Sequence, residues 1–131
     1  MPGLERDTPI PTEITLDRKR RVLVLTYGET AYELTFEYLR VMSPSAEVRG
    51  HGPGQEVLQV GKRDVDILEL EPVGMYAIKP RFSDGHDTGI YSWDFLYDLA
   101  VHHEAYWADY LRRLEAAGAS RDASSAAGAS T

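Results

Sequence analysis

The residues best suited to chemistry lie in one short stretch, Phe82–Trp93, where Asp84, His86 and Asp87 stand close together. A histidine beside carboxylates is typical of a metal ligand or of a general base. It is also typical of a loop histidine whose ring hydrogen bonds hold a turn, and the spacing does not separate these interpretations. The iron-binding pattern His-x-Asp is absent, because Asp87 follows His86 directly. We therefore treat these three side chains as a candidate ligand or partner site.

The other histidines add one member to this site. His51 lies in a glycine-rich stretch and could approach His86 in the folded chain, so we include it. His102 and His103 are adjacent on a predicted helix, where neighbouring side chains project about 100° apart and do not chelate one ion easily. We predict that His103 is a core residue, because it falls on the apolar face, and that His102 is exposed.

Two stretches resemble anion-binding motifs but lack the flanking sequence features that such motifs require. Gly50, Gly52 and Gly54 alternate, but no strand leads into them and no Gly-Lys-Ser/Thr follows, as nucleotide-binding loops require. We predict an irregular surface loop over residues 43–55. The run Arg18–Arg21 is basic, yet blocks of charge usually face water, so we predict a solvated hairpin turn there.

Bulk composition excludes several classes of protein. A chain of 131 residues supports one domain. The absence of cysteine excludes disulfides, thiolate zinc sites, cysteine-ligated clusters and cysteine nucleophiles, and it fits a reducing compartment. A net charge of -7 argues against nucleic acid as a partner. No apolar run approaches the ~18 residues of a membrane span, and residues 1–11 do not resemble a signal peptide, so we expect a cytoplasmic protein.

The first half of the chain predicts strands and one short helix. Residues 14–16 and 22–27 read as a β-hairpin, and residues 32–34 as a brief extended piece. Thr35 is a suitable N-cap for a helix over residues 36–41. That helix should end near Met42, because a proline follows two residues later.

The second half predicts two strands and a long helix. Residues 65–71 alternate imperfectly, which suggests a strand with a bulge, and residues 75–82 form a strand that Pro80 should keep at an edge. From Ser92, a suitable N-cap, apolar residues recur at steps of three and four until Gly118 ends the pattern. The expected core packs this helix on the sheet through Trp93, Leu96, Ala100, Trp107 and Leu114 against Val22, Val24 and Ile78.

These elements predict an α+β fold: a small antiparallel or mixed β-sheet, a short helix and a long packed C-terminal helix. Residues 1–12 should be a flexible lead-in and residues 13–117 a single domain. Residues 118–131 are mostly alanine, serine and glycine, which bury too little apolar area to offset ordering entropy. We therefore expect a disordered tail.

Four groups of residues carry a family resemblance. They are Leu39-Arg40 with Ser43-Pro44-Ser45-Ala46-Glu47, His51-Gly52-Pro53-Gly54-Gln55, Glu71-Pro72-Val73-Gly74, and Ser83-Asp84-Gly85-His86 with Gly89-Ile90-Tyr91-Ser92-Trp93. As a set they resemble the N-terminal domain of gamma-butyrobetaine hydroxylase and its free-standing bacterial relatives. The resemblance covers roughly residues 13–114 and implies a compact α+β domain with a small sheet and a packed C-terminal helix.

The resemblance also bears on metal binding. In the hydroxylases the similar domain holds a structural zinc through three cysteines and one histidine, and the histidine matches His86. The cysteine positions fall on Ser43, Ser45 and Val48, none of which can replace a thiolate. We therefore expect no metal and no cofactor. His86 should instead order its own loop by hydrogen bonding near the Ser43–Ser45 turn.

The resemblance leaves the activity open. The iron and 2-oxoglutarate chemistry of the hydroxylases belongs to a separate catalytic domain, for which this chain is too short, so we expect no enzyme. Similar domains are also fused to iron–sulfur carrier ATPases, which suggests an accessory role in metal or iron–sulfur metabolism. Our main hypothesis is a non-catalytic interaction module whose partner is another protein. The alternative is a metal-binding protein that uses His86 with His51 or nearby carboxylates.

Overall fold

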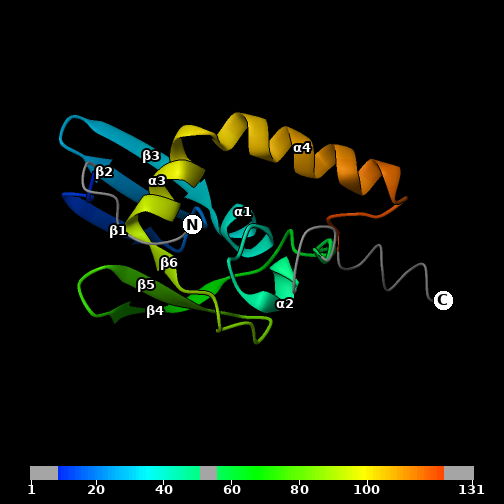
Figure 1. Ribbon diagram of the computed structural model, residues 1–131, viewed down its shortest axis with the longest axis horizontal. Coiled ribbons are helices and arrows are strands. Elements are labelled where there is room, and N and C mark those ends of the chain that lie inside the picture. The colour runs from blue at the N-terminus through cyan, green and yellow to red at the C-terminus, as the bar shows by residue number, and fades with distance from the viewer. Residues whose placement is uncertain (1–8, 51–55, 123–131) are drawn as a thin grey trace.

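A computed structural model describes residues 9–50 and 56–122, and this part of the chain forms two three-stranded antiparallel sheets and four helices (Figure 1). The first sheet has the order β1–β2–β3 and the second the order β4–β5–β6. The α+β class is confirmed, with two small sheets in place of the single sheet expected. The bounds are β1 Glu13–Asp17, β2 Val22–Tyr27, β3 Thr30–Thr35, α1 Phe36–Val41, α2 Ala46–Arg49, β4 Ile67–Val73, β5 Ala77–Phe82, β6 Tyr91–Ser92, α3 Trp93–Val101 and α4 His103–Ala116.

The first sheet confirms the predicted hairpin and extends it. Glu13 pairs with Thr26, and Asp17 pairs with Val22. The chain then turns at Gly28, whose φ of 64° is costly for other residues, into a full third strand. The expected brief piece at residues 32–34 is therefore the middle of β3.

Three of the four basic residues between β1 and β2 pair with acids of this chain. Arg20 lies 2.5 Å from Glu33, and Arg21 lies 3.5 Å from Asp64. Arg18 lies 3.6 Å from an oxygen of Asp66. These exposed pairs agree with the predicted solvated turn.

The two short helices begin at capping hydroxyls. Thr35 accepts a hydrogen bond from the Tyr38 backbone N–H at 3.0 Å, which confirms the predicted N-cap of α1. The prediction of irregular structure throughout residues 43–55 was wrong for α2. Ser45 caps this single turn by accepting from the Glu47 backbone N–H, and Gly50 ends it with a φ of 75°.

The second sheet carries both predicted irregularities. Its register shifts between Ile67 and Glu69, so the bulge is confirmed. Strand β6 pairs only with Ala77 and Ile78 of β5. In the described chain, Pro80 therefore lies beyond the part of β5 that pairs with β6. The missing N–H of Pro80 removes no hydrogen bond to β6.

The long predicted helix is divided at His102. This residue has φ -108° and ψ 20°, and it separates α3 from α4. Its ring nitrogen Nδ1 lies 2.9 Å from the Asp98 carboxylate one turn earlier. His102 is exposed, as predicted, whereas His103 is half-buried and packs edge-on against the Tyr38 ring at 4.4 Å between centroids.

One apolar core joins both sheets to α1 and α3. The Tyr38 hydroxyl crosses it and donates to the Leu99 carbonyl at 2.8 Å. Burial of these side chains is the main favourable term in the folding free energy. The buried members are Leu23, Leu25, Leu34, Phe36, Tyr38, Leu39, Val65, Ile67, Ile78, Phe82, Tyr91, Leu96, Leu99 and Ala100.

The core departs from the expected packing in one strand and one helix. Strand β2 contributes Leu23 and Leu25 to this core, whereas Val24 is only half-buried; Val22 is buried, as predicted, but lies outside the cluster. Leu114 does not join this core but a smaller cluster with Val41 and Tyr110. Leu96, Ala100 and Ile78 belong to this core, as predicted, and Trp93 and Trp107 pack against it while partly buried.

The start of the predicted disordered tail is held to the domain. The backbone N–H groups of Gly61 and Arg63 donate to the carbonyls of Ser120 and Arg121, both at 2.9 Å. The Arg121 guanidinium also binds both oxygens of buried Glu37, at 2.6 and 2.7 Å. The prediction was therefore wrong for residues 118–122. Residues 123–131 and the lead-in residues 1–8 lie outside the described residues.

We predict that Leu96→Ala lowers the free energy of unfolding by about 2–5 kcal/mol, because Leu96 is fully buried and its loss leaves a cavity. A urea titration measures the effect. Val101→Ala, at a position 40% exposed on the same helix, is the matched control and should cost less than about 1 kcal/mol. Equal effects of the two substitutions would show that this face of α3 is not the core.

We predict that deletion of residues 119–131 lowers the melting temperature, whereas deletion of residues 123–131 does not. The longer deletion leaves the buried Glu37 carboxylate without its guanidinium partner, and an unsatisfied buried acceptor costs about 1–3 kcal/mol. The shorter deletion keeps every contact named above. Thermal melts of the two truncated proteins make the comparison, and identical melting temperatures would contradict the anchoring role of Arg121.

Candidate functional site

His86 is buried between α2 and the loop that joins β5 to β6. Only 4% of the residue is exposed. Its Nε2 lies 2.8 Å from the Ser43 hydroxyl, and its Nδ1 lies 3.0 Å from a carboxylate oxygen of Glu47. The structure thus places His86 beside the Ser43–Ser45 turn, and both ring nitrogens have partners.

These contacts belong to a closed circuit of five residues, which we call the polar ring: Ser43, His86, Glu47, Thr88 and Ser45. Beyond the two histidine contacts, the Thr88 hydroxyl donates to Glu47 at 3.3 Å and lies 2.6 Å from the Ser45 hydroxyl. The Ser45 backbone N–H closes the circuit by donating to Ser43 at 3.2 Å. The ring therefore joins two segments about 40 residues apart in the sequence.

The donors and acceptors of the polar ring fit one arrangement of protons. The Thr88 hydroxyl donates its single proton to Glu47, so the Ser45 hydroxyl must be the donor in its hydrogen bond with Thr88. The carboxylate of Glu47 can only accept, so Nδ1 of His86 carries the proton. Nε2 then accepts from Ser43. A neutral imidazole satisfies this pattern, and burial, followed by the nearby charge of Arg40, lowers the pKa of His86 despite the opposing effect of Glu47.

Ser43, His86 and Glu47 share the hydroxyl–imidazole–carboxylate connectivity of serine hydrolases. Sequence reasoning missed this arrangement, because Ser43 and Glu47 precede His86 by 43 and 39 residues. Ser43 is completely buried, however, and a Cβ atom at Gly89 would lie only 2.5 Å from its Oγ. A substrate carbonyl has no approach to this hydroxyl, so the geometry suits a structural role.

Asp84 pairs with two cations and also accepts a backbone hydrogen bond within its own turn. One oxygen lies 2.9 Å from Nε of Arg40 and 2.5 Å from Nζ of Lys62, and the other accepts from the His86 backbone N–H at 3.2 Å. Burial raises the pKa of Asp84, but the bonds from Lys62 and His86 and the charge of Arg40 outweigh it, so the net pKa is lowered. Asp84 is the local partner of the His86 backbone, not of its ring.

Of the other two predicted site residues, the structure describes only Asp87, which does not join the polar ring. Asp87 is exposed and lines a separate hollow on the second sheet, beside the cross-strand pairs Glu69–Arg81 and Glu71–Lys79. His51 lies outside the described residues. Within residues 9–50 and 56–122, no cluster of three histidine, aspartate or glutamate side chains is arranged to hold a metal ion.

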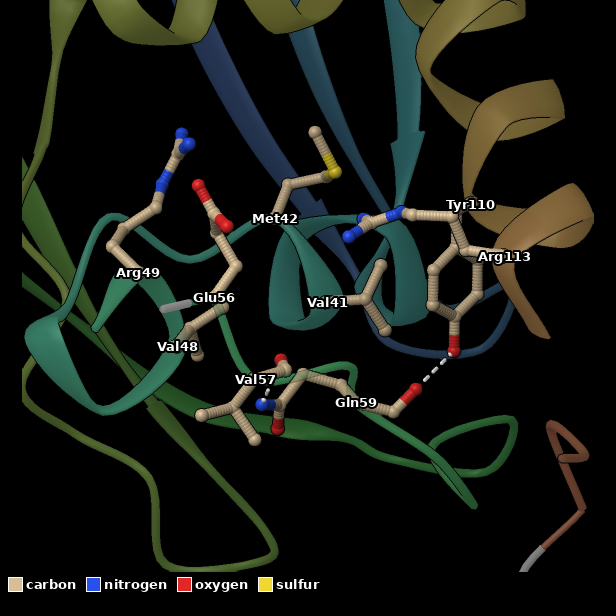
Figure 2. A pocket seen from close by; sticks show the side chains of 9 residues that line it. All are labelled: Val41, Met42, Val48, Arg49, Glu56, Val57, Gln59, Tyr110 and Arg113. Carbon is tan, nitrogen blue, oxygen red and sulfur yellow. Dashed lines mark hydrogen bonds between the residues drawn. The ribbon is translucent and has the colours of Figure 1, made fainter. Parts of the chain in front are cut away.

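A groove lies on another face, between α4 on one side and α2 with residues 56–59 on the other (Figure 2). It consists of two adjoining hollows of about 50 and 380 Å³, and both are lined by Met42, Arg49, Glu56 and Arg113. The Tyr110 hydroxyl bridges the walls by donating to the Gln59 carbonyl at 2.7 Å. No local sequence pattern predicted the groove, because its walls come from distant segments.

The groove combines an apolar floor with charged walls. Its floor includes Val41, Met42, Val48 and Leu99. The Arg49 guanidinium lies 5.5 Å from the centre of the Phe95 ring, an arrangement that orients its N–H groups.

The charged side chains of the groove walls differ in whether they have a hydrogen-bond or ion-pair partner. Both oxygens of Asp98 accept from the Tyr106 hydroxyl at 3.0 Å. Asp109 is bound by Arg112 and lies 3.4 Å from Arg113. Within the described chain, Arg49 has no carboxylate at ion-pair distance, so its guanidinium is the cation of the groove that remains free to bind an anion.

The two small sheets, the capped short helices and the bent C-terminal helix define a small α+β domain. The chain belongs to the gamma-butyrobetaine hydroxylase-like N-terminal family, whose model matches residues 14–97. No curated protein matches the chain.

The solved structures that are similar to this chain include the following three. Two are NMR solution structures with 51% and 48% sequence identity and TM-scores of 0.78 and 0.75; they cover 88% and 92% of this chain, and 91% of each matched chain is covered. The third is a 1.93 Å crystal structure of a protein of unknown function from Acidithiobacillus ferrooxidans, a member of the DUF971 family. It is 37% identical over 69% of this chain and 91% of its own, with a TM-score of 0.57.

The zinc centre of the hydroxylases does not fit the residues present here. Of its four ligand positions, Val48 is aliphatic, and Ser43 and Ser45 offer hydroxyls that already bond within the polar ring. Both ring nitrogens of His86 are engaged as well. Structural zinc requires thiolates or imidazoles, so these side chains do not form such a site.

No described helix is both long and apolar enough to cross a membrane.

We predict that His86 makes the protein less stable on acidification from pH 7 to pH 5. Its pKa is below the ordinary 6.5 in the folded state, so the unfolded chain binds more protons as the pH falls through 6.5. The contribution of His86 to stability is therefore fully present above pH 6.5 and is lost as the pH falls below that value. Urea titrations across this range should show a smaller pH dependence in His86→Gln than in the wild type.

His102→Gln is the matched control for this measurement, because His102 is exposed. It should keep the pH dependence of the wild type. His103 is half-buried, and burial lowers its pKa as well. Its acid-sensitive contribution to the free energy of unfolding therefore persists in both variants. Unchanged pH dependence in His86→Gln would contradict the neutral, buried imidazole.

Proposed function

We propose that this chain is a non-catalytic module that binds a segment of another protein in the groove between α4 and α2. The observation that carries the proposal is the combination, in one groove, of an apolar floor and an oriented guanidinium without a carboxylate partner in the described chain. Protein-binding grooves typically pair apolar contact with a few polar groups that fix orientation.

The groove favours a segment that carries an apolar anchor next to a carboxylate. The larger hollow, about 380 Å³, accommodates a large side chain over Met42 and Leu99. Arg49 then binds the carboxylate with its planar N–H fork, which matches carboxylate geometry. Arg113, on the opposite wall and 46% exposed in its side chain, adds a second positive charge.

Several observations support binding over catalysis. The hydroxyl of Ser43, which has a hydrolase-like connectivity, is fully buried. Nucleic acid is a poor partner, because the chain carries a net charge of -7 and the basic run beside β1 is paired with acids. The proposal keeps the cytoplasmic location expected from the sequence.

The metal-binding alternative at His86 is not part of this proposal. Both ring nitrogens are occupied by Ser43 and Glu47, so a metal would have to displace two hydrogen bonds. A connection with metal or iron–sulfur metabolism rests on family resemblance alone.

We predict that a photo-crosslinking amino acid at Val57 captures a partner protein in the native cell, because Val57 lines the groove and is 53% exposed. The matched control is the same amino acid at Met75, which is 91% exposed in the β4–β5 turn. Mass spectrometry identifies the captured proteins. Arg49→Ala should weaken the captured complex by roughly ten- to hundredfold, since a hydrogen bond to a charged group is worth about 1.5–3 kcal/mol.

Capture that is equal from Val57 and Met75, or that Arg49→Ala leaves unchanged, would contradict the groove as the binding site. A fluorophosphonate probe distinguishes the catalytic hypothesis. It should not label the wild-type protein, and labelling that disappears in Ser43→Ala would replace the binding proposal by a hydrolase.

A further inference from the structure

We infer that the polar ring is a metal-free staple that takes the place of the family's zinc centre in this chain. It includes three of the four positions that match the zinc ligands, namely Ser43, Ser45 and His86. Glu47 and Thr88 complete it. The inference concerns how the fold is held together and does not depend on the proposed groove.

A staple is needed here because the two segments are short and irregular. Ser43–Glu47 spans a turn and the start of the four-residue helix α2. The opposite segment, residues 83–90, connects β5 to β6 and contains no helix or strand. Neither segment gains stability from a long ladder of backbone hydrogen bonds, so side chains must join them.

The close approach of the two segments supports a direct connection. The Cα of Gly89 packs against Ser43 and Pro44, since a Cβ there would lie 2.5 Å from Ser43 Oγ and 3.4 Å from Pro44 Cδ. His86 Nε2 reaches the same hydroxyl at 2.8 Å. Direct hydrogen bonds therefore span a junction that a metal ion bridges in the family's zinc-binding members.

The closed circuit also has an energetic consequence. Each hydroxyl of the ring can donate only one hydrogen bond, so the direction of one hydrogen bond fixes the direction of the next. Buried networks of this kind polarise along the chain, and their members act as a unit. Ser43 and Thr88 have no hydrogen bond between them but belong to the same circuit, which makes their energetic coupling a direct measure of ring closure.

The test is a double-mutant cycle on the untagged full-length protein, read by thermal melting. Ser43→Ala and Thr88→Val should each lower the melting temperature by about 3–6 °C, the shift expected for one lost hydrogen bond. The double variant should lose clearly less than the sum, because the first substitution has already opened the circuit.

Ser83→Ala provides the control pair. The Ser83 hydroxyl accepts from the Asp66 backbone N–H and lies in the same loop outside the ring. Combined with Thr88→Val, it should give an additive shift. Additivity of Ser43→Ala with Thr88→Val would overturn the inference.

A measurement on the single variant covers the case in which Ser43→Ala does not fold. In Thr88→Val, amide hydrogen exchange at Ser45 and Glu47 should accelerate several-fold, because both N–H groups donate to ring hydroxyls. Unchanged exchange at both amides would also overturn the inference.

Elemental analysis and a melt with EDTA address the metal directly. We expect far less than one zinc per chain and no change of melting temperature with the chelator. Stoichiometric zinc, or a melting temperature that falls with EDTA, would show that the chain keeps a metal centre and would overturn the staple.

Discussion

The fold depends on one constraint: two sheets that are each too small for a core of their own must share one. Strand β6 has only two residues, and a sheet of this size needs apolar packing from outside itself. Tyr91 is the residue at which the parts meet. It pairs with Ile78 in the second sheet, lies two residues before the start of α3, and donates from a fully buried hydroxyl to the Leu39 carbonyl of α1 at 2.5 Å. Burial raises the pKa of this hydroxyl, which keeps it a donor.

Elements that depend on local signals could be predicted from the sequence. The hairpin, the caps at Thr35 and Ser92, and the bulge in β4 each follow from residue types within a few positions. The break at His102 could not be predicted, because the apolar period continues across it. The core face of β2 was equally hidden, since residues 22–25 are all apolar and alternation carries no information.

The candidate site was predictable only where the family resemblance placed two segments together. That resemblance put His86 near the Ser43–Ser45 turn, and the hydrogen bond to Ser43 agrees with it. Glu47 had no such signal, because a solvent-facing acid in the first turn of a capped helix is ordinary. The groove depends on how α4 packs against distant segments, and the sequence alone does not determine that packing.

The anchored C-terminal segment ties the chain just after the groove wall at residues 56–59 to the rest of the domain. Arg121 clamps Glu37 of α1 and stacks over Trp107 of α4 at 5.1 Å, while Ser120 and Arg121 hold the backbone at Gly61 and Arg63. One short strap thus touches the helix that forms one wall and the segment that continues from the other. The segment that follows the groove wall at residues 56–59 is thereby tied to α1 and α4 by residues that do not themselves line the groove.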